Sequence, residues 1–336
     1  MKNMSNGKLL EVKDLCVSFF THAGVVKAVD GITYSLNYNE VMGIVGESGS
    51  GKSVEAYSIM GLLQDPGKVT GGSVTFEGKD ILSFNSEQMR EFRGNQASMI
   101  FQNPMTCLNP VYTIGNQLGE ALRVHNKTIT KKDAEEQVIK MLDHVGINNA
   151  EKRIHQYPHE FSGGMRQRAM IAMALICKPK LLIADEPTTA LDVTIQAQIL
   201  RLMKDLQRQE NTSIIFITHN LGVVAEICDR VSVMYGGHIV EQGNVNDIFY
   251  RPAHPYTKKL LASMPRLDAE HHEKLIPIEG TPIDLLNPPT GCNFGPRCTS
   301  CMKICTRMKP DFTDLGDGHI SACFLHMKEK KGSENE

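Results

Sequence analysis

The chain has 336 residues, of which 41% are hydrophobic and 22% charged, and its formal net charge is −2. This length exceeds one compact core of ordinary size, so two or three structural units are expected. The nearly balanced charge gives no support for nucleic acid as a partner, and no apolar run approaches the roughly 20 residues that span a bilayer. Residues 1–7 lack the apolar core of a secretory signal, which predicts a cytoplasmic chain whose membrane role comes through partners.

A glycine-rich loop follows the β-rich pattern of residues 8–40 and an apolar strand pattern at 40–45. The loop fits the phosphate-loop pattern GxxxxGK followed by Ser or Thr, and its residues are Gly46, Glu47, Ser48, Gly49, Ser50, Gly51, Lys52 and Ser53. In such a loop the backbone N–H groups surround a phosphate, the lysine binds the β- and γ-phosphates, and the serine hydroxyl binds Mg²⁺. Residues 54–63 predict a helix whose N-terminus faces the phosphates.

Strands and helices alternate along the rest of the first 245 residues. The apolar periodicity predicts strands at 71–78, 97–101, 181–184 and 213–217, and helices within 115–146, from near 164, and over 194–209. Alternation of this kind is typical of a parallel sheet covered by helices, so an α/β fold is expected.

Two carboxylates stand at the end of the predicted strand 181–184. Asp185 occupies the place at which phosphate-loop ATPases bring a carboxylate to Mg²⁺. Glu186 is placed to orient or deprotonate an attacking water. Strands that end in acidic turns are common, so the pair gains its specificity from the complete phosphate loop before it and from Pro187 after it.

A serine and two glycines open the helix predicted near residue 164. Ser162, Gly163 and Gly164 form either an ordinary helix N-cap or a second anion-binding helix N-terminus. One phosphate loop does not need a second phosphate contact in the same chain. A second anion site therefore makes sense if it binds the nucleotide of a partner.

From about residue 8 to 245, these motifs resemble the nucleotide-binding subunits of ABC transporters. The resemblance implies a RecA-like P-loop ATPase core with an antiparallel β subdomain and an inserted α-helical subdomain at about 103–162. It also implies a head-to-tail dimer in which Ser162-Gly163-Gly164 of one subunit contacts the ATP held by the other. Met165 departs from the glutamine that is commonest at its position, so the side-chain contact there is not carried over.

The same resemblance implies roles for four further residues. Gln102 would be the loop glutamine that senses Mg²⁺ and couples to the membrane subunits, and His219 would contact the γ-phosphate. Asp192, at the end of Ala190-Leu191-Asp192, would cross the dimer interface. Phe19 would stack on adenine, with its neighbour Phe20 as the alternative.

Five of the nine cysteines crowd near the C-terminus: Cys292, Cys298, Cys301, Cys305 and Cys323. In a reducing cytoplasm this crowding favours a metal site over disulfides. Four thiolates suit a [4Fe–4S] cluster or a structural Zn²⁺ about equally well. The spacing lacks the paired CxxC of zinc ribbons, although residues 298–301 form one CxxC that keeps zinc open.

The C-terminal region resembles the extension of oligopeptide and dipeptide importer ATPases, and in particular the D-type subunit. The resembling stretches are 251–257, 288–298 and 318–323, together with 103–106 and 161–167. Some D-type subunits carry a [4Fe–4S] cluster, which implies Cys292, Cys298, Cys305 and Cys323 as its ligands, with zinc as the alternative. The small Cys-rich extension is expected over 246–327, and the charged residues 328–336 are expected to be a disordered tail.

As a whole, the resemblance implies the ATP-hydrolysing subunit of an importer of oligopeptides or dipeptides, peripheral at the cytoplasmic face of the membrane. The implied partners are a second ABC ATPase subunit of the sister F-type, two membrane-spanning permease subunits and an extracytoplasmic peptide-binding protein. The alternatives are an importer of nickel or another small solute, a soluble ABC ATPase without a transport role, and a redox sensor built on the cysteines.

Overall fold

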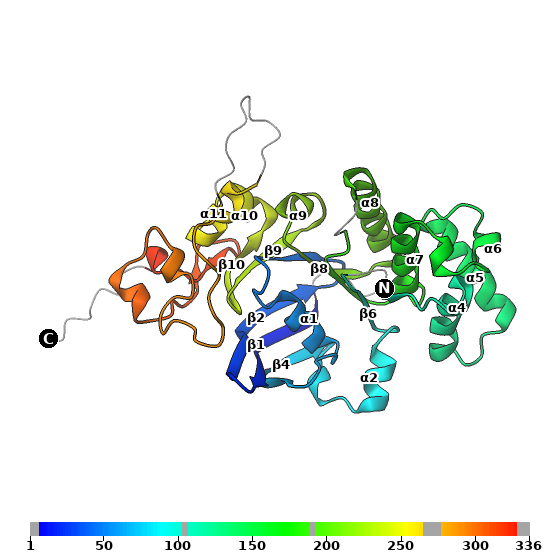
Figure 1. The fold of residues 1–336 in the computed structure, drawn as a ribbon, viewed down its shortest axis with the longest axis horizontal. Coiled ribbons are helices and arrows are strands. Elements are labelled where there is room, and N and C mark those ends of the chain that lie inside the picture. Colours follow the sequence, from blue (N-terminus) through cyan, green and yellow to red (C-terminus); the bar gives the residue numbers. More distant parts are fainter. Residues whose placement is uncertain (1–6, 103–106, 189–191, 265–276, 328–336) are drawn as a thin grey trace, which may run out of the picture.

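The computed structural model describes residues 7–102, 107–188, 192–264 and 277–327. These residues form two β-sheets at the centre, a group of helices at one end and a C-terminal segment at the other (Figure 1). The predictions for 103–106, for Ala190-Leu191 and for the tail 328–336 lie outside the described residues. Within the described ranges, no helix is long and apolar enough to cross a membrane.

The smaller sheet is antiparallel, with the strand order β2-β1-β4-β5. Its strands are β1 (Lys8–Thr21), β2 (Gly24–Asn37), β4 (Gly67–Phe76) and β5 (Lys79–Asp80). Leu10 and Val12 of β1 are buried in one apolar cluster with Ile44 and Ile217 of the larger sheet. The two sheets are therefore held together by a shared hydrophobic core.

The larger sheet has the order β11-β12-β10-β9-β3-β8-β7-β6. Its parallel strands are β3 (Val41–Val45), β6 (Ala97–Ile100), β7 (Leu181–Asp185), β8 (Ser213–Thr218) and β9 (Arg230–Tyr235). Every residue of β3, β7 and β8 is buried, as expected for parallel strands covered on both faces. The predicted α/β fold is confirmed in this sheet.

The antiparallel end of the larger sheet joins the C-terminal segment to the core. β10 (His238–Asn244) pairs with β9 on one side and with β12 (Ile320–Ser321) on the other, and β11 (Thr313–Asp314) pairs with β12. Three 3₁₀ turns, Gly295–Arg297, Lys303–Thr306 and Phe324–His326, make up most of the other regular structure in this segment.

Helices pack around the larger sheet: α1 (Lys52–Ile59), α7 (Gly163–Leu175), α8 (Val193–Glu210), α9 (Leu221–Ile227), α10 (Val245–Tyr250) and α11 (Pro255–Ala262). α1 begins inside the phosphate loop, earlier than the predicted residue 54, because Gly51 adopts a left-handed N-cap conformation (φ +103°). It ends at Ile59, before the predicted residue 63, and Gly61 follows with a left-handed backbone (φ +59°). α2 (Ser86–Phe92) lies beside the smaller sheet.

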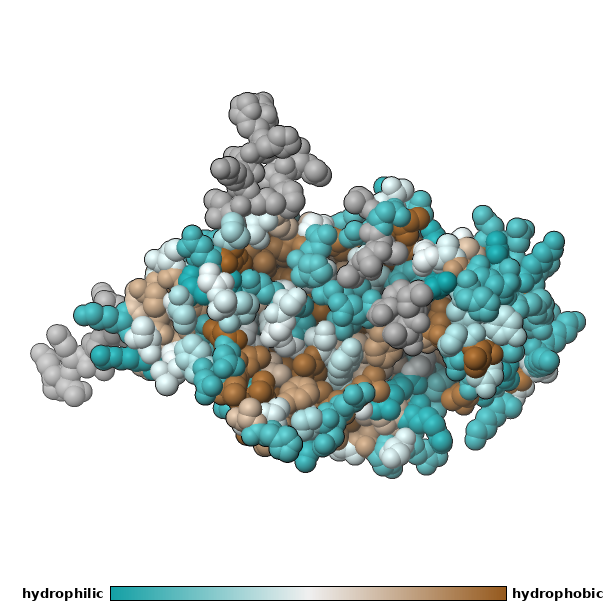
Figure 2. Space-filling model, in the orientation of Figure 1, coloured by the Kyte–Doolittle hydropathy of each residue, from teal (hydrophilic) through white to brown (hydrophobic). Residues whose placement is uncertain are grey.

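A group of helices stands apart from the sheets, at the right of Figure 1. It contains α4 (Ile114–His125), α5 (Lys131–His144) and α6 (Ala150–Arg153). The predicted helical stretch 115–146 is divided in two because Thr130 caps α5, where its hydroxyl accepts the Asp133 N–H at 3.1 Å. Figure 2 shows hydrophilic side chains gathered over this group and hydrophobic ones mainly toward the middle of the face.

Candidate functional site

Four parallel strands end at one edge of the larger sheet, and each ends beside a predicted site residue. The phosphate loop follows β3, Gln102 follows β6, Asp185 ends β7 and His219 follows β8. Because the carboxyl ends of neighbouring parallel strands lie together, residues that are distant in the sequence meet at this edge.

Close packing requires two glycines of the phosphate loop. A Cβ on Gly46 (φ +158°) would lie 2.2 Å from the Met234 carbonyl oxygen, and one on Gly51 would lie 2.4 Å from the Ala28 carbonyl oxygen. No real Cβ tolerates such contacts, and the backbone conformation also favours glycine. The loop therefore holds a tight curve into the first turn of α1, whose free N–H groups suit an anion.

The Lys52 ammonium is buried at the centre of this loop. Its Nζ donates to the carbonyl oxygens of Gly46 and Glu47, at 2.9 Å each, and lies 3.3 Å from Ser50 Oγ. Burial lowers the pKa of Lys52, and the nearby carboxylates, Glu186 first among them, act against this shift. A buried cation with acidic neighbours on one side is suited to bind an incoming phosphate.

Ser53 and Asp185 form a hydrogen-bonded pair beside the loop. Ser53 Oγ donates to Asp185 Oδ1 at 3.0 Å. Asp185 is 1% exposed, and burial raises the pKa of its carboxyl group, with Glu186 acting in the same direction. A carboxylate in such a place gains from a nearby cation. Hydroxyl and carboxylate oxygens are ligands that Mg²⁺ prefers, so the pair fits the predicted metal.

Glu186 joins the ends of three strands. Gln102 Nε2 donates to Glu186 Oε2 at 2.8 Å, and His219 Nδ1 lies 3.0 Å from Glu186 Oε1. The backbone of Glu186 is left-handed (φ +47°), which is uncommon for a residue with a side chain. Its N–H donates to the Ile217 carbonyl oxygen at 2.9 Å, which holds this conformation. Strained backbone of this kind concentrates at functional sites.

The serine and glycines of the second predicted anion site lie at the N-terminus of α7. Ser162 caps the helix, and its hydroxyl accepts the Met165 N–H at 3.3 Å. Ser162 and Gly163 are exposed, and no atom lies within 4 Å of the place where a Cβ on Gly163 would stand. Both predicted roles are compatible with this geometry, because capping uses the side chain while an anion would use the backbone N–H groups.

Two further polar residues lie at the start of α8 and on α7. Asp192 caps α8, where its side chain accepts the Ile195 N–H at 2.9 Å. Gln167, buried on α7, donates to the Pro187 carbonyl oxygen. This contact, which links α7 to the segment after Glu186, is not predicted from the sequence. A glutamine on a largely apolar helix is the signal that could have found it, because glutamine is rarely buried.

The two candidate aromatic residues for adenine are neighbours near the end of β1. Phe19 is half-buried, and a Cβ on Gly67 would lie 2.7 Å from its ring. Phe20 is 49% exposed. The Phe19 ring is thus packed against the chain and still partly accessible. The Phe20 ring is the more accessible of the two.

The C-terminal cysteines converge on Cys305. The Cys292 N–H donates to the Cys305 carbonyl oxygen at 2.8 Å. Burial raises the pKa of Cys292 to about 11, with Cys305 and Cys323 acting in the same direction. Burial also raises the pKa of Cys298 and of Cys323, and each again interacts with Cys305. The other three predicted ligands, Cys292, Cys298 and Cys323, are thus each within electrostatic reach of Cys305.

The spacing of these cysteines bears on which metal they fit. A Cβ on Gly295 would lie 3.8 Å from Cys301 Sγ and 3.9 Å from the Cys292 Cβ, which are ordinary van der Waals contacts. Across the described ranges, however, no three His, Cys, Asp or Glu side chains are placed to hold a metal ion. Zinc, with Zn–S bonds of about 2.3 Å, requires a tight shell of sulfurs. A [4Fe–4S] cluster binds one thiolate at each iron.

Two residues beyond the predicted cassette boundary contact the phosphate loop. Tyr256 Oη accepts the Glu47 N–H at 2.9 Å. Arg297 donates to both carboxylate oxygens of Glu47, at 2.6 and 3.1 Å. From the sequence, both residues belong to stretches that resemble the importer extension, and neither is predicted to reach the nucleotide site.

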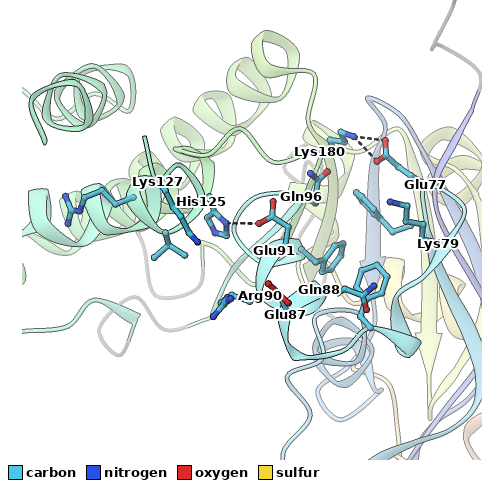
Figure 3. A pocket seen from close by; sticks show the side chains of 15 residues that line it. Glu77, Lys79, Glu87, Gln88, Arg90, Glu91, Gln96, His125, Lys127 and Lys180 are labelled. Carbon is cyan, nitrogen blue, oxygen red and sulfur yellow. Dashed lines mark hydrogen bonds and ion pairs between the residues drawn. The ribbon is translucent and has the colours of Figure 1, made fainter. Parts of the chain in front are cut away.

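A cavity of about 900 Å³ lies apart from these residues, between α2 and the end of α4 (Figure 3). On its wall, Lys180 Nζ donates to both carboxylate oxygens of Glu77, at 2.7 and 2.8 Å, and His125 lies 3.9 Å from Glu91. None of the predicted nucleotide-site residues lines it. Its lining carries both signs of charge, which favours no particular ligand.

Comparisons with known proteins identify the family of this chain. Residues 29–189 match the family described as ABC transporter, and residues 240–305 match the oligopeptide/dipeptide transporter C-terminal region. CbiO1 of Clostridium perfringens, part of the ABC transporter complex CbiONQ, has the same cassette fold. It superimposes with a TM-score of 0.63 at 27% identity, over 73% of this chain and 92% of its own.

Relatives match over nearly the whole length. The dipeptide transport ATP-binding protein DppD of Bacillus subtilis is 56% identical over 319 residues, which cover 95% of each chain. The oligopeptide transport ATP-binding protein OppD of Escherichia coli is 54% identical over 321 residues, which cover 96% of this chain and 94% of its own. The chain therefore belongs to the ATP-binding subunits of ABC transporters, in the group that carries the oligopeptide/dipeptide transporter C-terminal region.

Proposed function

We propose that this chain, a transport-coupled ATPase by its family, powers the import of oligopeptides or dipeptides. Its nucleotide would be bound between residues 46–53 of this chain and a helix N-terminus of a second subunit. The observation that carries the proposal is the meeting of Gln102, Glu186 and His219 beside the Ser53–Asp185 pair. These residues come from four separate strand ends, and the parallel sheet brings their polar side chains together beside the phosphate loop.

In the proposed mechanism, the loop amides and Lys52 bind the β- and γ-phosphates. Ser53, Gln102 and Asp185 would hold Mg²⁺, whose charge would offset that of the phosphates during transfer. Phe19 would stack on adenine.

Glu186 would direct the attacking water. Its two hydrogen-bonded neighbours, Gln102 and His219, hold the carboxylate in one orientation, and His219 would contact the γ-phosphate. A positioned carboxylate that accepts a proton from water typically accelerates hydrolysis by about 10²–10⁴-fold.

The second contact to the nucleotide would come from a partner. Ser162, Gly163 and Gly164 lie at an exposed helix N-terminus on α7 and would bind the ATP held by the other subunit, with Asp192 at the interface. The cassette would span residues 8–245, with its helical subdomain at about 103–162.

The variant Glu186→Gln tests the site. We expect it to keep ATP affinity within about twofold while phosphate release falls by at least about a hundredfold, because the amide cannot accept a proton. Glu226→Gln, which changes an exposed glutamate on α9, serves as the matched control. Near-normal turnover by purified Glu186→Gln would remove Glu186 from this role.

The proposed cargo is supported by the names of the relatives, which assign dipeptide and oligopeptide transport to those proteins. The proposed assembly contains a sister F-type ATPase subunit, two membrane-spanning permease subunits and an extracytoplasmic peptide-binding protein. This chain would lie peripherally at the cytoplasmic face of the membrane, held by the permeases.

Uptake assays in cells distinguish the cargo classes. Deleting the chain should abolish uptake of labelled di- or oligopeptides and leave nickel uptake unchanged. Expressing the Glu186→Gln variant in the deletion strain should not restore peptide uptake. Loss of nickel uptake with normal peptide uptake would favour the small-solute alternative. Proteins that co-purify from gently solubilised membranes identify whether the second ATPase is a sister subunit or a second copy.

The extension over 246–327 would carry a [4Fe–4S] cluster on Cys292, Cys298, Cys305 and Cys323. Its support is the interaction of Cys292, Cys298 and Cys323 with Cys305, together with the match of residues 240–305 to the oligopeptide/dipeptide transporter C-terminal region. The cluster would supply covalent cross-links between parts of a segment that has little apolar core. Zinc is the alternative metal, with the same thiols as its ligands.

Metal analysis under exclusion of oxygen tests this proposal. We expect iron and sulfide in the purified protein, with a brown colour that Cys298→Ser removes. Cys301→Ser, which changes the exposed cysteine outside the proposed set, should keep the colour. A colourless wild-type protein that contains zinc and no iron would refute the cluster.

A further inference from the structure

We infer that the C-terminal extension positions the phosphate loop for ATP, with Arg297 and Tyr256 as the positioning residues and Glu47 as the point of contact. The inference rests on the proposed assignment of residues 46–53 as the ATP phosphate site. It assigns the extension a part in nucleotide binding.

Glu47 is held at all three of its polar groups. Its N–H donates to Tyr256 Oη at 2.9 Å, its carboxylate accepts two hydrogen bonds from Arg297, and its carbonyl oxygen accepts from Lys52 Nζ at 2.9 Å. The Arg297 contact is bidentate, the geometry that fixes orientation as well as distance. Glu47 thus connects the extension to the lysine that would bind the phosphates.

Arg297 is itself fixed, so it can act as a rigid support. It is 8% exposed, and its guanidinium also donates to the carbonyl oxygens of Glu279 and Ile278, at 3.0 Å each. Tyr235 Oη lies 3.3 Å from the same group. Its hydrogen bond to Glu47 raises the pKa of Arg297, which keeps it charged at every physiological pH.

Tyr256 stands in an aromatic cluster that joins the core to the extension. Its ring centroid lies 4.7 Å from that of Tyr235 in β9 and 5.3 Å from that of Phe294 in the extension. Tyr256 and Phe294 are buried. The hydroxyl that accepts the Glu47 N–H is therefore carried by a packed ring and not by a mobile side chain.

These contacts should act on binding more than on chemistry. Without them, ATP would have to order the loop when it binds, which costs affinity. Glu186 and His219 stand on other strand ends and make no contact with Arg297 among the hydrogen bonds described above. A loss of Arg297 should thus raise the KM for ATP and leave kcat nearly unchanged.

The test uses the full chain assembled with its partner subunits. We expect Arg297→Met to raise the KM for ATP by about tenfold, with kcat within about twofold. Tyr256→Phe removes only the hydroxyl, and we expect an increase of about threefold. Arg307→Met is the matched control, because Arg307 is an exposed arginine of the same extension, and its KM should match that of the wild type.

A double-mutant cycle separates positioning from general destabilisation. If Arg297 acts through Glu47, Arg297→Met should change KM by less than about twofold in a Glu47→Gln background. Arg297→Lys, which keeps the charge but loses the bidentate contact, should recover part of the affinity. An undiminished effect of Arg297→Met beside Glu47→Gln, or a KM equal to that of Arg307→Met, would overturn the inference.

Lys52→Ala distinguishes this inference from the proposed function beneath it. If Lys52→Ala binds ATP as well as the wild type, the assignment of the phosphate loop fails. If Lys52→Ala loses ATP while Arg297→Met and Tyr256→Phe bind it normally, only the positioning role fails. Weaker ATP binding in all three variants, together with the expected result of the double-mutant cycle, supports both the phosphate-loop assignment and the positioning role.

Discussion

The nucleotide-binding core and the C-terminal segment 277–327 are stabilised in different ways. In the core, β3, β7 and β8 are completely buried. In the segment, strands are two residues long, helices are single 3₁₀ turns, and several apolar side chains remain exposed: Met302, Ile304, Met308, Phe312 and Leu315. The core therefore depends on the apolar volume it buries, and the segment depends on individual contacts.

Those contacts tie the segment to the core at separate points. His319 Nε2 lies 2.8 Å from the fully buried Glu241 Oε1, and Lys309 Nζ donates to Asp30 at 2.9 Å. Together with the Arg297–Glu47 pair and the β10–β12 ladder, they join the segment to three different parts of the core. The comparison teaches that loss of apolar volume should matter most in the core and loss of single polar contacts most in the segment.

The largest expected effect is a cavity in the core. Phe216 is completely buried in β8, and Phe216→Ala should lower the free energy of unfolding by about 3–5 kcal/mol, because it removes a packed ring. Urea unfolding measures it. Phe312→Ala, at a position that is 43% exposed in the segment, should change stability by less than about 0.5 kcal/mol. Equal losses would contradict the comparison.

The next effect concerns a buried acid in the core. Burial raises the pKa of Glu55 to about 8, while its Oε1 accepts a hydrogen bond from Tyr34. The folded state thus binds more protons than the unfolded state between pH 4.5 and 8, and stability falls as pH rises through this window.

Glu55→Gln keeps the acceptor for Tyr34 and removes this ionisation. Between pH 6 and pH 8.5, the wild type should lose about 3 kcal/mol more than the variant. Urea midpoints at both pH values measure the difference. Parallel pH profiles of the two proteins would show that Glu55 does not titrate as described.

The smallest effect has the opposite pH dependence and lies where the core meets the segment. Burial lowers the pKa of His254 to about 3, and His326 acts in the same direction. The unfolded state therefore binds more protons between pH 3 and 6.5, and the stabilisation present above pH 6.5 is lost as pH falls.

From pH 7.5 to 5.5 this loss should reach about 1 kcal/mol, and hydrogen exchange of the α11 amides should detect it. His254→Asn should remove the pH dependence, because asparagine does not titrate. It keeps the helix cap, because its side chain can still accept the Tyr256 N–H that His254 Nδ1 accepts at 3.0 Å. His144→Asn, at an exposed position, should leave it intact. A dependence that survives His254→Asn would assign it to another group.

Much of the core could be predicted from local patterns. The apolar run 181–184 lies within β7 (Leu181–Asp185), and the run 213–217 lies within β8 (Ser213–Thr218). The helix after the phosphate loop was predicted with displaced ends, because left-handed glycines rather than hydrophobicity decide where α1 begins and ends.

The segment could be predicted only in part. Crowded cysteines and prolines mark it in the sequence, and the predicted boundary at residue 245 falls where β10 ends and α10 begins. β12 could not be predicted from the sequence, because a two-residue strand has no periodicity. It forms because β10 offers an edge with which it can pair.

By itself, the sequence determined which groups are candidates to bind phosphate and Mg²⁺, because the phosphate loop, the Asp185–Glu186 pair and the Ser162–Gly164 helix start are each contained in a few consecutive residues. The tertiary structure decided which of them act together. Glu186 meets Gln102 and His219, and Glu47 meets Arg297, only because a parallel sheet and the folded-back extension bring distant segments within hydrogen-bond distance. Contacts between segments far apart in the chain leave no periodic trace in either segment, so they emerge only once the fold is formed.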